Sequence, residues 1–258
     1  MENIIIGLAI PFIGTTLGAS MVFLIRNKMG ELSKKMLLGF ASGIMVAASF
    51  WSLLQPALEQ SGDGTFMGIL PILLGFGAGM GFLFALDSLI PHQHLDNPKD
   101  EGLRSSLPRS TKLALAVALH NIPEGMAVGV VFAGTLSGDT HLTLAGAFAL
   151  SIGMAIQNIP EGAIISMPLR SEGKSRRQAF TLGMLSGLVE PLAAIVTLFF
   201  LDNTASAMPI LLSFAAGAML YVIVEELIPE SQSGEHSNIG TIGFALGFAL
   251  MMTLDSVL

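Results

Sequence analysis

The stretch LALAVALHNIPEGMAVGVVFAGTL, residues 113–136, places a polar motif in the middle of an apolar run. About 20 mostly apolar residues suffice for an α-helix to cross the hydrocarbon core of a bilayer. Comparable runs recur along the chain, so we predict an all-α membrane protein in which residues 1–258 form a single transmembrane domain. Its eight transmembrane helices are expected at residues 3–25, 36–58, 66–90, 113–136, 142–169, 178–201, 207–228 and 238–257.

The composition does not fit a soluble domain, because 52% of the 258 residues are hydrophobic and only 12% are charged. The 29 glycines are best explained as contacts between membrane helices, where small residues let backbones approach closely. Cysteine is absent, so the chain offers no thiolate ligand and no cysteine nucleophile. The net charge is −7 and the basic residues form no broad patch, so we expect no nucleic-acid partner.

The twelve Lys and Arg residues fall in three clusters that occupy alternate loops. They are Arg26, Lys28, Lys34 and Lys35, then Lys99, Arg104, Arg109 and Lys112, then Arg170, Lys174, Arg176 and Arg177. Because cytoplasmic loops carry an excess of Lys and Arg, the loops after the first, third and fifth helices are expected in the cytoplasm. Both termini are then extracytoplasmic. We expect a multi-pass protein of the cell membrane, plasma or inner, whose partner is the lipid bilayer.

Two pairs of related segments indicate internal repeats. LLGFASGIM at residues 37–45 returns as LLSFAAGAM at residues 211–219, and NIPEG occurs at residues 121–125 and 158–162. In the predicted topology the members of each pair run in opposite directions. We therefore predict an inverted repeat of helices 1–3 and 6–8 around a central pair, helices 4 and 5, an arrangement typical of secondary transporters. Helices 3 and 8 also share LGF, at Leu74 and Leu246, and LDS, at Leu86 and Leu254, although a shared richness in Gly and Leu is an alternative explanation of this similarity.

The two NIPEG motifs each place three polar side chains on one helix face, because residues three and four apart are neighbours there. They are His120, Asn121 and Glu124 in HNIPEG, and Gln157, Asn158 and Glu161 in QNIPEG. Pro123 and Pro160 remove a backbone donor and clash with the preceding turn, so they are expected to kink both helices and to direct polar backbone groups toward a cavity.

The carboxylates Glu124, Glu161 and Glu190 lie inside predicted spans, where a charge costs roughly 2.5–3.5 kcal/mol. No Lys or Arg lies in a predicted span, so the compensating charge must come from protons or from an imported cation. An imidazole beside carboxylates suits Zn2+, Fe2+ or Mn2+ better than Ca2+ or Mg2+. The alternative is a hydrogen-bonded core histidine with protonated glutamates between helices, which the duplicated motif makes less favourable.

With these motifs the chain resembles the ZIP family of divalent metal-ion transporters along essentially its whole length. The resemblance implies a metal site formed by His120, Glu124, Gln157 and Glu161, next to a second position formed by Asn121, Asn158 and Glu190 and bridged by the two motif glutamates. Family members often carry Asp at the position of Asn158. A ligand from helix 2, Met45 or Ser49, is a further candidate for this site.

The resemblance also implies a metal path at the cytoplasmic side. In the family an acidic residue followed by loop histidines marks this exit, and Asp87, His92 and His94 match that pattern. Glu225 and Glu226 match an acidic pair of the seventh helix. On a polar loop, histidines are otherwise usually solvated and without a role.

We therefore expect a transporter that moves Zn2+, or else Cd2+, Fe2+ or Mn2+, into the cytoplasm by alternating access, with the metal as substrate and no cofactor. The alternative is an intramembrane metal-dependent hydrolase, since a His and a Glu on one buried face also describe catalytic zinc sites. Such sites usually contain two or three histidines and a general base. Only His120 lies within a span and HExxH does not occur, so we do not expect an enzyme. The sequence leaves open whether the chain forms a homodimer.

Overall fold

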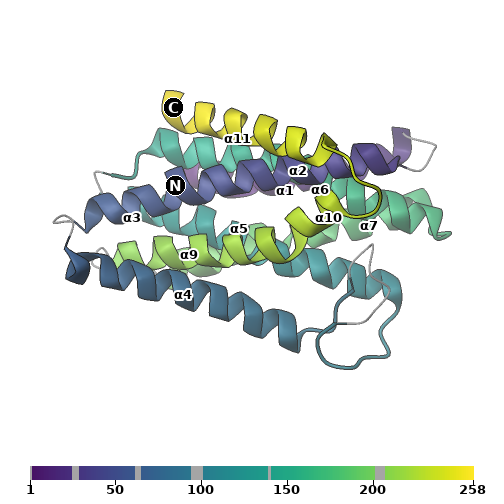
Figure 1. Ribbon diagram of the computed structural model, residues 1–258, viewed down its shortest axis with the longest axis horizontal. Coiled ribbons are helices and arrows are strands. Elements are labelled where there is room, and N and C mark those ends of the chain that lie inside the picture. The colour runs from purple at the N-terminus through teal and green to yellow at the C-terminus, as the bar shows by residue number, and fades with distance from the viewer. Residues whose placement is uncertain (1, 25–28, 62–64, 94–100, 139–140, 201–206) are drawn as a thin grey trace.

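The computed structural model describes residues 2–24, 29–61, 65–93, 101–138, 141–200 and 207–258, and these form a bundle of helices (Figure 1). Eight helical spans are long and apolar enough to cross a membrane, which confirms the predicted number. They are α1 (Glu2–Leu24); α2 (Glu31–Ala48) with η1 (Ser49–Leu54) and α3 (Gln55–Gln60); α4 (Phe66–Leu89); α5 (Arg109–Leu136); α6 (Leu144–Ser171); α7 (Arg176–Gly187) with α8 (Val189–Phe200); α9 (Met208–Val222) with η3 (Ile223–Leu227) and α10 (Ile228–Gln232); and α11 (Ile239–Val257).

Several spans extend beyond the apolar runs that predicted them. The second span begins at Glu31 rather than at residue 36, and the seventh continues to Gln232 rather than ending at residue 228. Hydropathy detects only the part of a helix that lies in hydrocarbon, whereas the helix continues into the polar boundary as long as its backbone hydrogen bonds are kept.

Three of the spans are composite, and a proline accounts for each irregularity. The π-helical segments η1 and η3 are followed by Pro56 and Pro229, and the break between α7 and α8 lies before Pro191. Proline lacks the N–H of the helical ladder and clashes with the carbonyl four residues earlier, so the preceding turn widens or opens. Both related stretches, 37–45 and 211–219, thus lead into a π-helical segment, while the inverted repeat itself remains a prediction.

The helices pack as two bundles that face each other. The site bundle consists of α1, α5, α6, α7 and α8, and it contains both NIPEG motifs; the second bundle consists of α2, η1, α3, α4, α9, η3, α10 and α11. Contacts of α5 with α9 and of α2 with α6 connect the bundles. Both termini lie at the same end of the molecule, opposite to the end where α7 begins and α10 ends (Figure 1).

Glycines hold each bundle together. A Cβ at Gly43 of α2 would meet the backbone of Phe244 in α11, and one at Gly18 of α1 would meet the backbone of Ile159 in α6. Among the described helical glycines, every such clash with backbone falls within one bundle. Close backbone approach therefore makes each bundle a tightly packed unit, whereas side chains alone fill the interface between the bundles.

The glycines of α4 offer a matched test. A Cβ at Gly79 would meet the carbonyl oxygen of Phe214 in α9, whereas nothing lies within 4 Å of the same position at Gly77. We expect Gly79→Ala to destabilise the protein by about 1–3 kcal/mol through overpacking. Gly77→Ala is expected to be neutral or slightly stabilising, because Ala is the better helix former. Thermal unfolding of the detergent-solubilised variants measures the difference, and equal melting temperatures would contradict this account of the packing.

Candidate metal-binding site

The predicted centre is buried between helices of the site bundle. All seven residues expected there are at most 8% exposed: His120, Asn121, Glu124, Gln157, Asn158, Glu161 and Glu190. α5 and α6 continue through their prolines and bring the two motifs together. Glu190 stands in the first turn of α8, where the positive end of the helix dipole favours an anion.

Asn158 has its amide orientation set by two acceptors. Its Nδ2 donates to Glu190 Oε2 at 2.7 Å and to the carbonyl oxygen of Pro11 at 3.3 Å. Neither acceptor can donate, so Asn158 Oδ1 must point the other way, where it accepts a hydrogen bond from Gln157 Nε2 at 2.9 Å. Thr15 Oγ1 donates to the remaining oxygen of Glu190 at 3.1 Å. The predicted second position is therefore closed by hydrogen bonds within the protein.

The same chain of hydrogen bonds leaves acceptor oxygens without partners. With its Nε2 used, Gln157 has a buried Oε1 that has no hydrogen-bond partner in the described part of the chain. Asn121 donates from Nδ2 to the carbonyl oxygen of Ser186 at 3.1 Å, and its buried Oδ1 is likewise left without one. The protein thus uses the amide donors itself and presents amide oxygens to the interior.

Glu124 and Glu161 add four carboxylate oxygens, all buried and without a hydrogen-bond partner among the described residues. Glu124 is close enough to Glu161 and Glu190 for mutual repulsion, and the amide groups of the QNIPEG motif lie beside it. Buried acceptors without donors are costly in a medium of low dielectric constant. A cation would satisfy these oxygens together, which is the chemistry of a metal site.

His120 reaches across the interface between the bundles. Its Nε2 lies 2.5 Å from Oε2 of Glu226 in η3. Both groups are close enough to Glu161 to interact electrostatically with its carboxyl group. The sequence grouped His120 with Glu124, Gln157 and Glu161, whereas the structure adds Glu226 of the second bundle as its nearest acidic partner. The imidazole therefore lies between carboxylates of two bundles.

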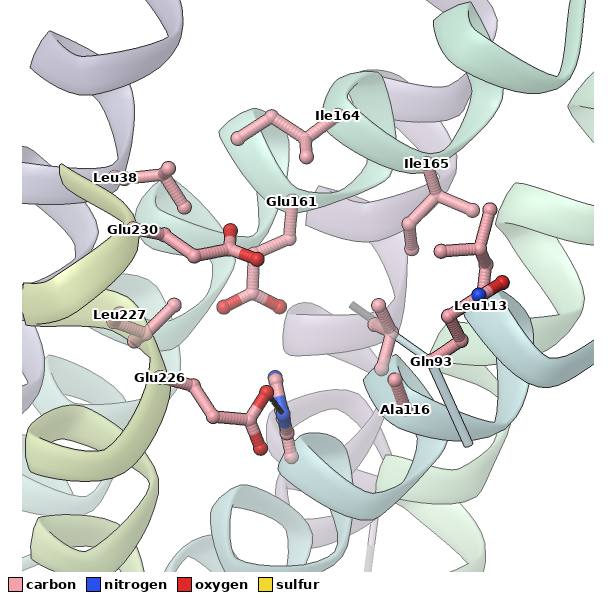
Figure 2. A pocket seen from close by; sticks show the side chains of 12 residues that line it. Leu38, Gln93, Leu113, Ala116, Glu161, Ile164, Ile165, Glu226, Leu227 and Glu230 are labelled. Carbon is pink, nitrogen blue, oxygen red and sulfur yellow. Dashed lines mark ion pairs between the residues drawn. The ribbon is translucent and has the colours of Figure 1, made fainter. Parts of the chain in front are cut away.

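A pocket of about 50 Å3 connects this centre to the end of the bundle where α7 begins and α10 ends. Figure 2 shows Glu161, Glu226 and Glu230 pointing into it from facing helices. We call this end the basic end, because the basic residues of the second and third clusters that the structure describes lie there. Glu230 was missed by the sequence analysis, although it stands four residues after Glu226 and so on the same helix face.

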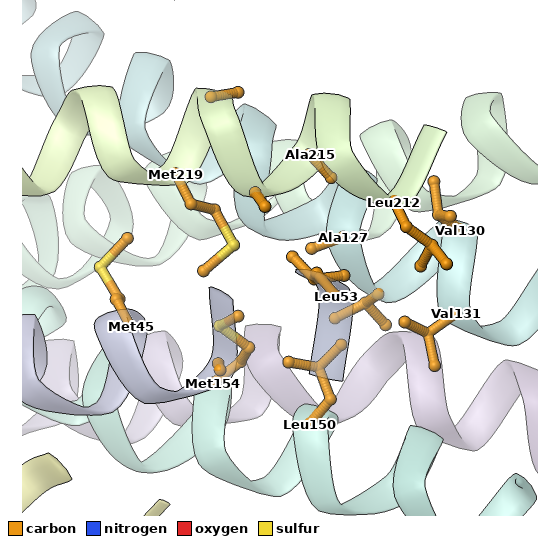
Figure 3. Packing of buried hydrophobic residues seen from close by; sticks show 14 of the residues in the cluster. Met45, Leu53, Ala127, Val130, Val131, Leu150, Met154, Leu212, Ala215 and Met219 are labelled. Atoms are coloured by element: carbon orange, nitrogen blue, oxygen red, sulfur yellow. The ribbon is translucent and has the colours of Figure 1, made fainter. Parts of the chain in front are cut away.

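A hydrophobic cluster adjoins the site, where Gln157 Nε2 lies 3.6 Å from Met154 Sδ, and Figure 3 shows part of this cluster. Met45, Leu53, Leu150, Met154 and Met219 belong to it, and each is fully buried. The structure thus places Met45, a candidate ligand, among apolar side chains. Ser49, the other candidate ligand from helix 2, is buried as well, and its hydroxyl oxygen has no hydrogen-bond partner among the described residues.

The residues predicted to form the cytoplasmic exit divide into two groups. His92 is buried, and its Nε2 lies 3.0 Å from Asp87 Oδ1 and 3.9 Å from Oε2 of Glu101, so the three could hold a metal ion together. No pattern in the loop sequence indicated Glu101, which an isolated antiparallel β-bridge with the backbone of His92 brings into place. Glu225, by contrast, is exposed, whereas its neighbour Glu226 is buried. His94 lies outside the described residues.

Fold and site together define a multi-pass membrane protein with a buried centre of carboxylates, amide oxygens and one imidazole. Residues 91–255 match the family model described as ZIP zinc transporter. The chain is 38% identical to "Zinc transporter ZIPB" of Bordetella bronchiseptica, over 98% of this chain and 81% of that protein. It is 34% identical to "Zinc transporter ZIP11" of Bos taurus and 36% identical to "Zinc transporter GufA" of Myxococcus xanthus, over 93% of each chain. The chain belongs to the ZIP family of zinc transporters, as its motifs predicted.

Asn158→Asp tests the hydrogen-bond chain at the second position. An aspartate would place a carboxylate oxygen against Glu190 Oε2 and the carbonyl of Pro11, where the amide now donates. We expect the metal-free variant to lose roughly 2.5–3.5 kcal/mol of stability, the cost of an uncompensated charge in a membrane helix. The loss should grow as the pH rises and the new carboxyl ionises, and added Zn2+ should reverse it while raising the bound metal per chain.

The control for this prediction is Asn158→Ala, which removes the same hydrogen bonds without adding charge. Its stability loss should depend on neither pH nor Zn2+. Melting temperatures measured with a chelator and with Zn2+, together with elemental analysis, separate the two variants. If Asn158→Asp behaved like Asn158→Ala, the side chain at this position would not face the metal site.

Proposed function

We propose that this protein transports divalent transition-metal ions, Zn2+ first among them, across the cell membrane into the cytoplasm. The observation that carries this proposal is the cluster of buried oxygens without donors on Glu124, Glu161 and Gln157, with His120 beside it and a pocket leading to the basic end. A bound metal cation would compensate the negative charge of this cluster whenever the carboxyl groups are not protonated. The names of the aligned relatives support zinc as that cation.

The donor set favours a borderline transition metal. One imidazole combines with carboxylate and amide oxygens, and the chain contains no cysteine. Ca2+ and Mg2+ prefer sites made only of oxygen, and Cu+ prefers sulfur, so Zn2+ is the best match, with Cd2+, Fe2+ and Mn2+ as competitors. The metal is the substrate of this site rather than a resident cofactor, because the pocket gives it a way out.

The two bundles supply a mechanism of alternating access. The pocket that Glu161, Glu226 and Glu230 line, here called the inner pocket, reaches the metal site. The hydrophobic cluster of Figure 3 separates the site from a second pocket at the opposite end, here called the outer pocket. Both pockets lie between the bundles, and glycine contacts make each bundle a unit. A displacement of the site bundle against the second bundle would close one pocket and open the other. Methionines suit this interface because their flexible side chains repack easily.

Glu226 is placed to assist release. It belongs to the second bundle yet pairs with His120, so motion between the bundles changes whether His120 faces the metal or Glu226. Conduction requires sites weak enough for the ion to leave. An ion released past Glu226 would next meet Glu230 and then the group of Asp87, His92 and Glu101.

The orientation in the membrane is inferred from the charge distribution, and import is inferred from the acidic groups along the pocket at the basic end. Cytoplasmic loops are rich in Lys and Arg, so the basic end, to which the inner pocket leads, is assigned to the cytoplasm and both termini to the outside. The present conformation is then inward-facing. The competing hydrolase proposal is less well supported, since a single imidazole lies at the centre and the aligned relatives are named transporters.

Neutral variants of the two motif glutamates test the site. Glu124→Gln and Glu161→Gln keep the shape but remove the charge that holds the ion. Changes to mere outer-shell partners already cost metal sites about 10- to 100-fold, so we expect uptake to fall further than this. The variants should fold normally and be at least as stable without metal, because they remove an uncompensated charge.

Zinc accumulation in a host deficient in zinc import measures this effect and the direction together. The wild-type chain should raise cellular zinc, and Glu172→Gln, the same change at an exposed position, should behave like the wild type. Lowered cellular zinc would show export, and near-normal uptake by both glutamine variants would remove the proposed site.

Glu225 and Glu226 form a matched pair of neighbours, one exposed and one buried. Glu226→Gln removes the charge that draws His120 toward the second bundle, so we expect a lower maximal rate while zinc binding at the centre persists. Glu225→Gln should change neither quantity. Uptake rates in proteoliposomes and zinc titration of the purified protein give the comparison. Equal effects of the two substitutions would mean that the pairing with His120 plays no part in release.

A further inference from the structure

A second pair of metal-binding side chains lies at the end opposite to the basic end. His141 Nδ1 is 3.5 Å from Glu59 Oε2, and both side chains are partly exposed. Glu59 belongs to α3 of the second bundle, while His141 lies between α5 and α6 of the site bundle. The pair therefore connects the two bundles, as His120 and Glu226 do near the other end.

The spacing of this pair suits a divalent transition metal. Zinc bonds to nitrogen and oxygen of about 2.0–2.1 Å place two ligands of a tetrahedron about 3.4 Å apart, close to the observed separation. The Glu59 carboxylate is held in place, because its Oε1 accepts a hydrogen bond from Gln55 Nε2 at 2.8 Å. Partial exposure leaves room for water to complete the coordination. Two protein ligands make a weak site, which would fill only at high metal concentration.

The pair stands beside the outer pocket, a polar cavity of about 240 Å3 between the bundles. His141 and Thr143 line it from the site bundle, and Ser52 and Asp255 line it from the second bundle. Asp255 contributes an acidic side chain to the lining, and no Lys or Arg is found among the described residues that line this pocket. The local field therefore favours cations.

The pair can form only when the outer pocket is narrow. If the bundles separated at this end to admit an ion to the centre, Glu59 and His141 would move apart with them. A ligand that binds one conformation better than another shifts the population toward it by its difference in affinity. An ion held by both side chains would thus stabilise the conformation described here, in which the inner pocket reaches the site.

We propose that Glu59 and His141 bind a divalent ion of the zinc class at the outer mouth, and that this ion holds the outer pocket closed. The site is separate from the transport centre. Given the proposed function, a high external concentration of zinc would slow its own uptake by holding the protein inward-facing. The closing effect itself requires no transport and is testable without it.

The absence of cysteine in the chain allows a clean measurement. Ser52→Cys places a single, nearly isosteric thiol in the outer pocket, and its rate of reaction with a membrane-impermeant maleimide reports how open that pocket is. The experiment uses Glu161→Gln as background, so that metal binding at the transport centre is disabled. We expect Zn2+ to slow labelling by about fivefold or more, the lower range of typical coupling between sites.

Two further variants identify the residues responsible. In the same background, His141→Ala and Glu59→Gln should abolish the protection by Zn2+, while Mg2+ should protect none of the variants. Gln55→Ala, which leaves both ligands in place, should retain most of the protection. Labelling that is insensitive to Zn2+ before His141 or Glu59 is changed would overturn the proposal, and so would protection that survives both changes.

This result is independent of the transport assay. Uptake that fails in the wild-type chain, together with protection by Zn2+, would reject the proposed function and keep the outer site. Normal uptake without protection would reject the outer site alone.

Discussion

The uncompensated charge of Glu124 and Glu161 is the constraint on which the rest of the structure depends. Two carboxylates without hydrogen-bond donors are costly in a medium of low dielectric constant, and no Lys or Arg lines the pocket beside them. The surrounding protein does not relieve this cost. The amide groups of Asn121, Gln157 and Asn158 donate to Ser186, Asn158 and Glu190, and the amide oxygens of Asn121 and Gln157 are buried without a hydrogen-bond partner among the described residues. This organisation supports the proposal that the site binds a cation that comes and goes.

The packing within each bundle differs from the packing between the two bundles. Within a bundle, glycines such as Gly18 and Gly43 bring backbones into contact, so the helices that hold the ligands keep a fixed relation. Between the bundles, the contacts are made by side chains, among them methionines that adapt their shape. The polar pairs that cross this interface, His120 with Glu226 and His141 with Glu59, lie at either side of the hydrophobic cluster. Motion of one bundle against the other would act on both pairs, which couples the metal centre to each end of the protein.

Prolines connect the local chemistry to this architecture. Pro56, Pro191 and Pro229 interrupt three spans, and the interruptions lie near the polar residues Ser52, Glu190 and Glu226. Irregular backbone inside a membrane is tolerated where it is buried in protein or lines a cavity. All three of these polar side chains are buried in the protein, in agreement with this rule.

The sequence by itself determined the class of fold and the number of spans, and it predicted the residues of the proposed central site, which the structure brings together. Hydropathy depends on the solvent around each helix, and the spacing of HNIPEG and QNIPEG depends only on the helical repeat, so neither needs tertiary information. Which partners these side chains meet was decided by tertiary structure. The pairing of His120 with Glu226, the bridge of Glu101 to His92 and the position of Met45 in the hydrophobic cluster each join segments distant in sequence or depend on packing. The direction of an amide such as Asn158 is likewise set by neighbours on other helices, and these become neighbours only when the bundles form.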